Sequence, residues 1–90
     1  MSRTIVTLVG KDHVGIIAAV CNYFAKNNIN ILDIKQTTVQ EYINMILIVD
    51  VSGFGGKFDD LVKGLDGVGK EVGCIIKAQH EEIFEMMHRI

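Results

Sequence analysis

Apolar and polar side chains alternate along the chain from Tyr42 to Val51. One face of this segment carries Ile43, Met45, Leu47, Val49 and Val51, and the other carries Asn44, Ile46, Ile48 and Asp50. A period of two residues is that of a β-strand, so we predict a strand here whose fully apolar face packs against helices. The opposite face is too apolar at Ile46 and Ile48 to be solvated throughout, which predicts that a second subunit or sheet covers it.

Six other segments show the periodicity of strands or helices. The predicted strands are residues 4–9, 29–39 and 72–78, and the predicted helices are residues 14–26, 58–70 and 81–90. The alternation of the second strand fails near Asp33, where we predict a bulge or a bend. Asp12 is the predicted N-cap of the first helix. The predicted inward face of that helix consists of Val14, Ile17, Ala18, Cys21, Phe24 and Ala25.

The order of these elements predicts an α+β fold of the ferredoxin-like type, βαββαβ. Its four strands form one antiparallel sheet with two helices on one face, and a short C-terminal helix follows. Right-handed crossovers place the first and third strands in the centre of the sheet. Ninety residues are too few for two domains, so we expect a single domain over 1–90. The βαββαβ core takes up about 3–80 and the C-terminal helix about 81–90 of this range.

Charge and composition exclude several classes of function. Nine basic against 11 acidic side chains give a net charge of −2, so the basic surface that nucleic acids require is missing. The apolar stretches are far shorter than the roughly 20 residues that span a bilayer, and the chain begins without a leader. We therefore expect a cytoplasmic protein that binds neither nucleic acid nor membrane. Cys21 and Cys74 are expected to be reduced core residues, and without an activated nucleophile we expect no catalysis and no cofactor.

The loop from Gly10 to Gly15 and the segment around Asn30 and Ile31 carry the pattern of a ligand site. With Asp12 as N-cap, the first N–H groups of the helix are expected to face an anion such as a carboxylate. The Asn30 amide and the backbone at Ile31 would complete the site and satisfy an ammonium group. A purely structural interpretation, with Asp12 as a cap and Asn30 as a turn residue, fits the spacing equally well.

A second pattern lies in the predicted C-terminal helix. Glu81, Glu85 and His88 fall on one helix face at a spacing that can bind a divalent cation. An ordinary solvated face explains the same residues, and it is the interpretation we favour.

The segments V-G-K-D-H-V-G-I at 9–16 and N-N-I-N-I-L-D-I at 27–34 resemble the ACT domain, and the resemblance covers nearly the whole chain. With Gln36, Thr37 and the terminal E-I-F-E-M-M-H-R-I, the chain looks like the small stand-alone ACT proteins. The resemblance implies a regulatory module that senses an amino acid at a homodimer interface and acts on a separate protein. The effector contacts that it implies are Asp12, His13, Val14, Gly15, Ile16, Asn30 and Ile31. The alternative is an interaction module without a ligand that assembles through Ile46 and Ile48.

Overall fold

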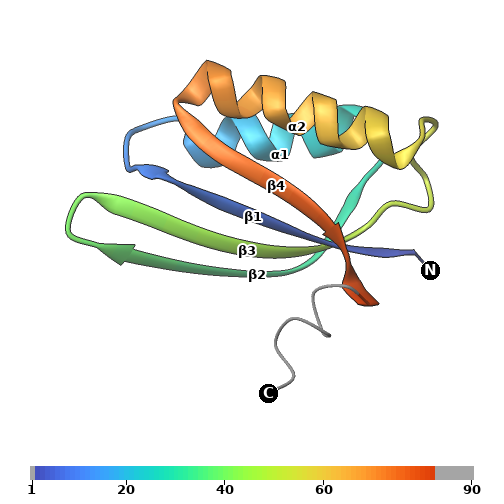
Figure 1. The fold of residues 1–90 in the computed structure, drawn as a ribbon, viewed down its shortest axis with the longest axis horizontal. Helices are drawn as coiled ribbons and strands as arrows, with labels where there is room; N and C mark the ends of the chain where they lie inside the picture. The colour runs from blue at the N-terminus through green and yellow to red at the C-terminus, as the bar shows by residue number, and fades with distance from the viewer. Residues whose placement is uncertain (1, 83–90) are drawn as a thin grey trace.

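The alternating segment is one of the two central strands of a four-stranded antiparallel sheet (Figure 1). The structure is a computed structural model that describes residues 2–82. Its elements are β1 (Arg3–Lys11), α1 (Ile16–Lys26), β2 (Asn30–Val39), β3 (Tyr42–Asp50), α2 (Phe58–Val72) and β4 (Cys74–His80). The strand order β2-β3-β1-β4 and the two helices on one face confirm the predicted ferredoxin-like fold. Residues 83–90, most of the predicted C-terminal helix, lie outside the described residues.

The two faces of β3 differ as the alternation predicts. Ile43, Met45, Leu47 and Val49 are each at most 2% exposed and belong to the core between sheet and helices. On the open face, Ile46 is 41% exposed. β1 pairs with β3 in register, with Val6 opposite Leu47 and Leu8 opposite Met45, so the middle of the core is built from these two strands.

Helix α1 begins later than predicted and buries a different face. Gly15, with a φ of 99°, is its N-cap, and no side chain caps it, so the assignment of Asp12 as N-cap was wrong. Val14 and Ile17 are 99% and 43% exposed, and Phe24 alone of the predicted inward face is fully buried. The buried residues of α1 are Ile16, Val20 and Phe24. The helix carries two apolar stripes, and the periodicity alone does not tell which of them faces the core.

The bulge in the sheet lies where the sequence predicts it, whereas the last strand begins later than predicted. The register of β2 on β3 shifts between Ile31 and Asp33, which confirms the bulge. Helix α2 runs on to Val72 instead of ending at Lys70, and it stops at Gly73, whose φ is 72°. β4 therefore begins at Cys74 and not at Val72, because a left-handed glycine is needed to reverse the chain there.

Both cysteines are free thiols, and Cys74 at the start of β4 is buried in the core as expected, whereas Cys21 is only partly buried. Neither α1 nor α2, the helices of the described core, is long and apolar enough to cross a membrane.

The hydroxyl group of Thr4 lies in the core without a hydrogen-bond partner among the described residues, and the side chain is 0% exposed. An unsatisfied buried hydroxyl group costs about 1–3 kcal/mol, and valine has nearly the same shape. We expect Thr4→Val to raise the free energy of unfolding by about 1 kcal/mol in urea denaturation. Thr7→Val on the open face is the matched control and should change little. Destabilisation by Thr4→Val would mean that the hydroxyl group has a partner.

Candidate functional site

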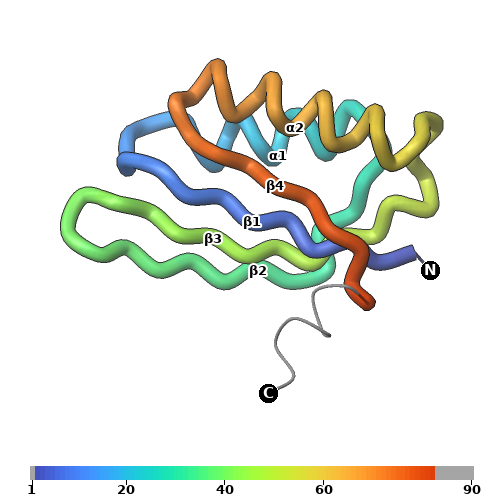
Figure 2. The backbone as a smooth tube through the Cα atoms, in the orientation of Figure 1, coloured from blue at the N-terminus to red at the C-terminus, as the bar shows by residue number. Residues whose placement is uncertain are grey.

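The β1–α1 loop lies at one end of the sheet, between the β2–β3 turn and the end of α2 (Figure 2). The backbone N–H of Asp12 donates to the carbonyl oxygen of Glu41 in that turn at 2.7 Å, and Lys11 forms an ion pair with the Glu41 carboxylate at 3.5 Å. On the other side, the Nε2 atom of the His13 ring is within hydrogen-bond distance of the Val72 carbonyl oxygen, at 2.6 Å. The loop is therefore held from both sides.

The predicted loop residues differ in how far they reach solvent. Asp12, His13, Val14 and Gly15 are exposed, whereas Ile16 is 1% exposed and anchors the loop in the core. The first turn of α1 contains no acidic side chain. The first N–H groups of a helix lack intrahelical acceptors and carry the positive end of its dipole, so this turn can attract an anion.

The electrostatics of the loop centre on His13. Hydrogen bonds to the carbonyl groups of Val72 and, second, Val14 raise the pKa of His13 above its ordinary value of 6.5. The nearby Asp12 charge acts in the same direction, and desolvation opposes it. Acceptors favour the protonated ring because it has two N–H donors.

Asn30 and Ile31 lie at the other end of the sheet, so they do not join the loop within one protomer. Asn30 pairs with Asp50, and Asp50 pairs with Arg3, the first residue of β1. The loop instead follows Lys11, which pairs with Tyr42. The two ends of β1 are about 26 Å apart at roughly 3.3 Å per residue. The cause is α1, which carries the chain back along the sheet before β2 begins.

Sequence reasoning missed the flank of the molecule where α1 lies beside the edge strand β2. Tyr23 contacts Gly64 of α2. At 100° per residue, Ile17 and Cys21 lie about 120–160° around the helix from Tyr23, on the side away from α2. Ile17 is 43% exposed and Cys21 partly buried, and Ile34 on the helix side of β2 is 44% exposed. We call Ile17, Cys21, Ile34 and the outer edge of β2 the β2 flank. The second apolar stripe of α1 was the signal that pointed to it.

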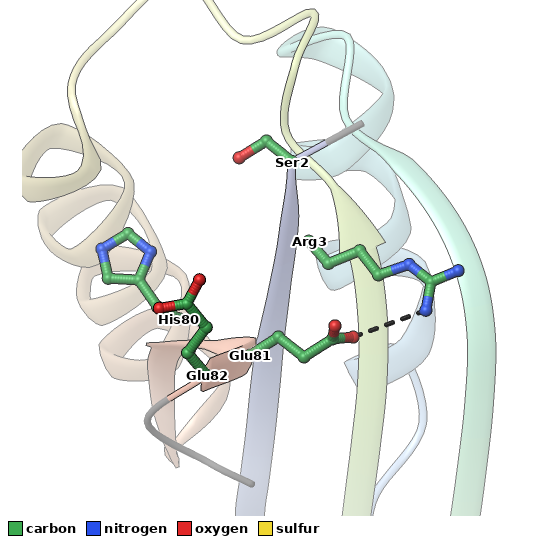
Figure 3. Close-up of a pocket in the computed structure, with 5 residues that line it drawn as sticks. All are labelled: Ser2, Arg3, His80, Glu81 and Glu82. Atoms are coloured by element: carbon green, nitrogen blue, oxygen red, sulfur yellow. Dashed lines mark ion pairs between the residues drawn. The ribbon is translucent and has the colours of Figure 1, made fainter. Parts of the chain in front are cut away.

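A cavity of about 680 Å³ opens at the end of β4, lined by Ser2, Arg3, His80, Glu81 and Glu82 (Figure 3). Arg3 forms an ion pair with Glu81 at 3.5 Å, on the side away from His80. His80 stacks on Phe58, with the ring centroids 4.1 Å apart. No metal-binding cluster occurs within residues 2–82. Glu85 and His88, the other two members of the possible cation site, lie outside the described residues.

The chain matches the family model of the ACT domain over residues 2–79. A UPF0237 protein from Bifidobacterium longum is 47% identical over 90 residues, 100% of both chains. The structure of an ACT domain protein from Streptococcus pneumoniae is 36% identical and has a TM-score of 0.81, covering 93% of this chain and 94% of that one.

The likeness extends in fold to the ligand-free regulatory subunit of aspartate kinase from Thermus thermophilus. That structure has a TM-score of 0.68 at 21% identity and covers 87% of this chain and 50% of that one. ACT domains are regulatory ligand-binding modules. On the family model and the relatives together, this chain belongs to the ACT domain family.

Proposed function

We propose that the protein is a cytoplasmic homodimeric module, a single ACT domain over 1–90, that binds a small amino acid or a related metabolite. It has no catalytic activity of its own and passes the signal to a separate regulated protein. The observation that carries this proposal is the position of the two candidate half-sites. They lie at opposite ends of one protomer, and Asn30 begins the edge strand β2, so a copy that runs antiparallel beside β2 carries its Asn30 to the end of the sheet where the loop lies.

A two-fold axis beside the β2 edge brings these half-sites together. Antiparallel pairing of β2 with its copy places the start of the copy's strand, at Asn30, beside the end of the first strand, at Val39. Val39 pairs with Tyr42, which pairs with Lys11 next to the loop. Each loop then faces Asn30 and Ile31 of the other protomer, and the dimer contains two equivalent sites.

The β2 flank supports this mode of assembly. Within the described residues 2–82, β2 is an edge strand whose outer N–H and C=O groups face no neighbouring strand, and such an edge is a template for pairing with another chain. The apolar side chains of the β2 flank lie along the same side of the protomer. Pairing of the strands therefore buries these side chains against their copies.

The groups at the combined site suit an amino acid. The N–H groups in the first turn of α1 donate to its carboxylate, with Gly15 and Ile16 positioning them. The Asp12 carboxylate and the Ile31 carbonyl group accept from its ammonium group, and Asn30 can do either. Val14, which is 99% exposed, is available to cover an apolar side chain of the ligand, and His13 sets the position of the loop.

Thermal unfolding in the presence of each standard amino acid tests the proposal. A ligand at tenfold excess over its dissociation constant stabilises the folded state by about 1.4 kcal/mol, which raises the melting temperature by roughly 5–10 °C. We expect one class of amino acid to give this shift, and Asn30→Ala and Asp12→Ala to abolish it. Asn44→Ala, on the open face of β3, is the matched control and should retain the shift. A shift that survives in Asn30→Ala would refute the assignment of this residue.

The open face of the sheet favours the second candidate, an interaction module without a ligand. Val9, Ile46 and Ile75 are 46%, 41% and 64% exposed there. Exposed apolar residues on one face are typical of a protein–protein contact. If no standard amino acid shifts the melting temperature and the protein assembles through this face, the results would support this candidate.

A further inference from the structure

The His13 ring connects two elements that are far apart in the sequence. Its Nε2 atom is 2.6 Å from the carbonyl oxygen of Val72, and its Nδ1 atom is 2.9 Å from the carbonyl oxygen of Val14. Val72 is the last residue of α2 and Val14 belongs to the β1–α1 loop. Both ring nitrogens thus face oxygen atoms that can only accept hydrogen bonds.

The protonation state of the ring decides whether both contacts are hydrogen bonds. A neutral imidazole has one N–H donor, so it can satisfy one of the two carbonyl groups, whereas an imidazolium has two donors and satisfies both. The final carbonyl groups of a helix also lack intrahelical donors and carry the negative end of its dipole. The Val72 carbonyl therefore favours a cation beside it.

We propose that His13 is a pH-sensitive clasp, which in its imidazolium form fastens the β1–α1 loop to the C-terminal end of α2. Loss of the proton leaves one N–H donor for the two carbonyl groups, so Val72 and Val14 compete for it and the attachment of the loop to α2 weakens. The attachment through Asp12 to the β2–β3 turn involves backbone atoms and does not titrate.

The surroundings of His13 support a protonated ring. Its pKa is raised, first by the Val72 carbonyl group and then by the Val14 carbonyl group. The charged and titratable groups at the adjoining ends of the neighbouring elements are Lys11, Asp12, Glu41, Asp66, Lys70, Glu71 and Cys74. Lys11 is paired with Glu41, and Lys70 with Asp66. Asp12 adds to the rise in the pKa of His13, while burial raises the pKa of the Cys74 thiol and keeps it neutral.

The direction of the pH dependence follows from the raised pKa. The stabilisation by the clasp is fully present below pH 6.5, the ordinary pKa of histidine, and is lost as the pH rises through the pKa of His13 in the folded protein. If the proposed function holds, the geometry of the ligand loop changes over the same pH range.

NMR titration of the ligand-free protein tests the clasp. We expect the His13 ring to titrate with a midpoint above pH 6.5, and the amide signals of Gly73 and Cys74 to shift with the same midpoint. In His13→Gln, which can donate to Val72 without titrating, this shift should disappear. The difference in melting temperature between the natural protein and His13→Ala should be largest below pH 6.5 and shrink as the pH rises.

Asp12→Asn separates the carbonyl contacts from the charge of Asp12. The His13 midpoint should stay above pH 6.5 in this variant, because the carbonyl groups are the larger cause of the rise. A midpoint at or below 6.5 in either protein, or Gly73 and Cys74 signals that do not follow His13, would overturn the clasp. The titration uses no ligand, so its failure and the failure of the proposed function are distinguishable.

Discussion

We expect the replacement of Gly69 by alanine to lower the free energy of unfolding by about 2 kcal/mol, although alanine is the better helix former. Gly69 is a buried residue of α2 that lies against the start of β4. A Cβ atom there would be 2.6 Å from the carbonyl oxygen of Cys74. Overpacking costs about 1–3 kcal/mol, and the upper end applies because a backbone atom in a paired strand has little freedom to move. The higher helix propensity of alanine offsets about 1 kcal/mol of this loss.

Gly67 in the same helix provides the matched control. Apart from its chain neighbours and the backbone of its own helix, a Cβ atom at Gly67 would have no heavy atom within 4 Å, so Gly67→Ala only improves the helix propensity. We expect it to raise the free energy of unfolding by about 1 kcal/mol. Urea denaturation of the two variants at one protein concentration should therefore give shifts of opposite sign. If both substitutions stabilise the protein, α2 does not approach β4 as closely as the structure places it.

The fold could be predicted from the sequence because the sheet has one buried and one open face. In β3, a shift of one residue would expose Leu47 and bury Asn44, so the alternation leaves a single register for the strand. Helix α1 lacks this constraint. Its Ile16, Val20 and Phe24 face the core, while Ile17 and Cys21 form a second apolar stripe at almost the same spacing. Which stripe is buried depends on the tertiary structure, so the sequence pattern alone was insufficient.

The residues of the candidate site stay a prediction, and the sequence did not indicate how far apart they lie within one protomer. The loop was recognised because Gly10 and Gly15 bracket a polar turn before a helix. The separation of this loop from Asn30 within one protomer follows from the topology, because a helix that returns along the sheet places the start of the next strand at the opposite end. The contact of His13 with Val72 joins residues 59 positions apart, and no local pattern signals it.

Replacing Ile17 with glutamate is expected to raise the dissociation constant of the dimer by at least 100-fold, about 2.7 kcal/mol. In the proposed dimer this residue lies on the β2 flank, and the two-fold axis would bury two unpaired carboxylates in one interface. The folded monomer should tolerate the change, since the Ile17 side chain is already 43% exposed. Sedimentation equilibrium measures the loss of the dimer, and circular dichroism shows that the fold remains.

Ile46→Glu is the matched control for this variant, because it makes the same change at a residue that is 41% exposed, but on the open face of the sheet. We expect it to remain dimeric. The opposite result, a monomeric Ile46→Glu and a dimeric Ile17→Glu, would place the interface on the open face and favour the interaction module without a ligand.

Ile17 is not among the proposed ligand contacts, yet each site needs the loop of one protomer and Asn30 of the other. Ile17→Glu should therefore also abolish the thermal shift by the ligand, and it should do so at any protein concentration that leaves the variant monomeric.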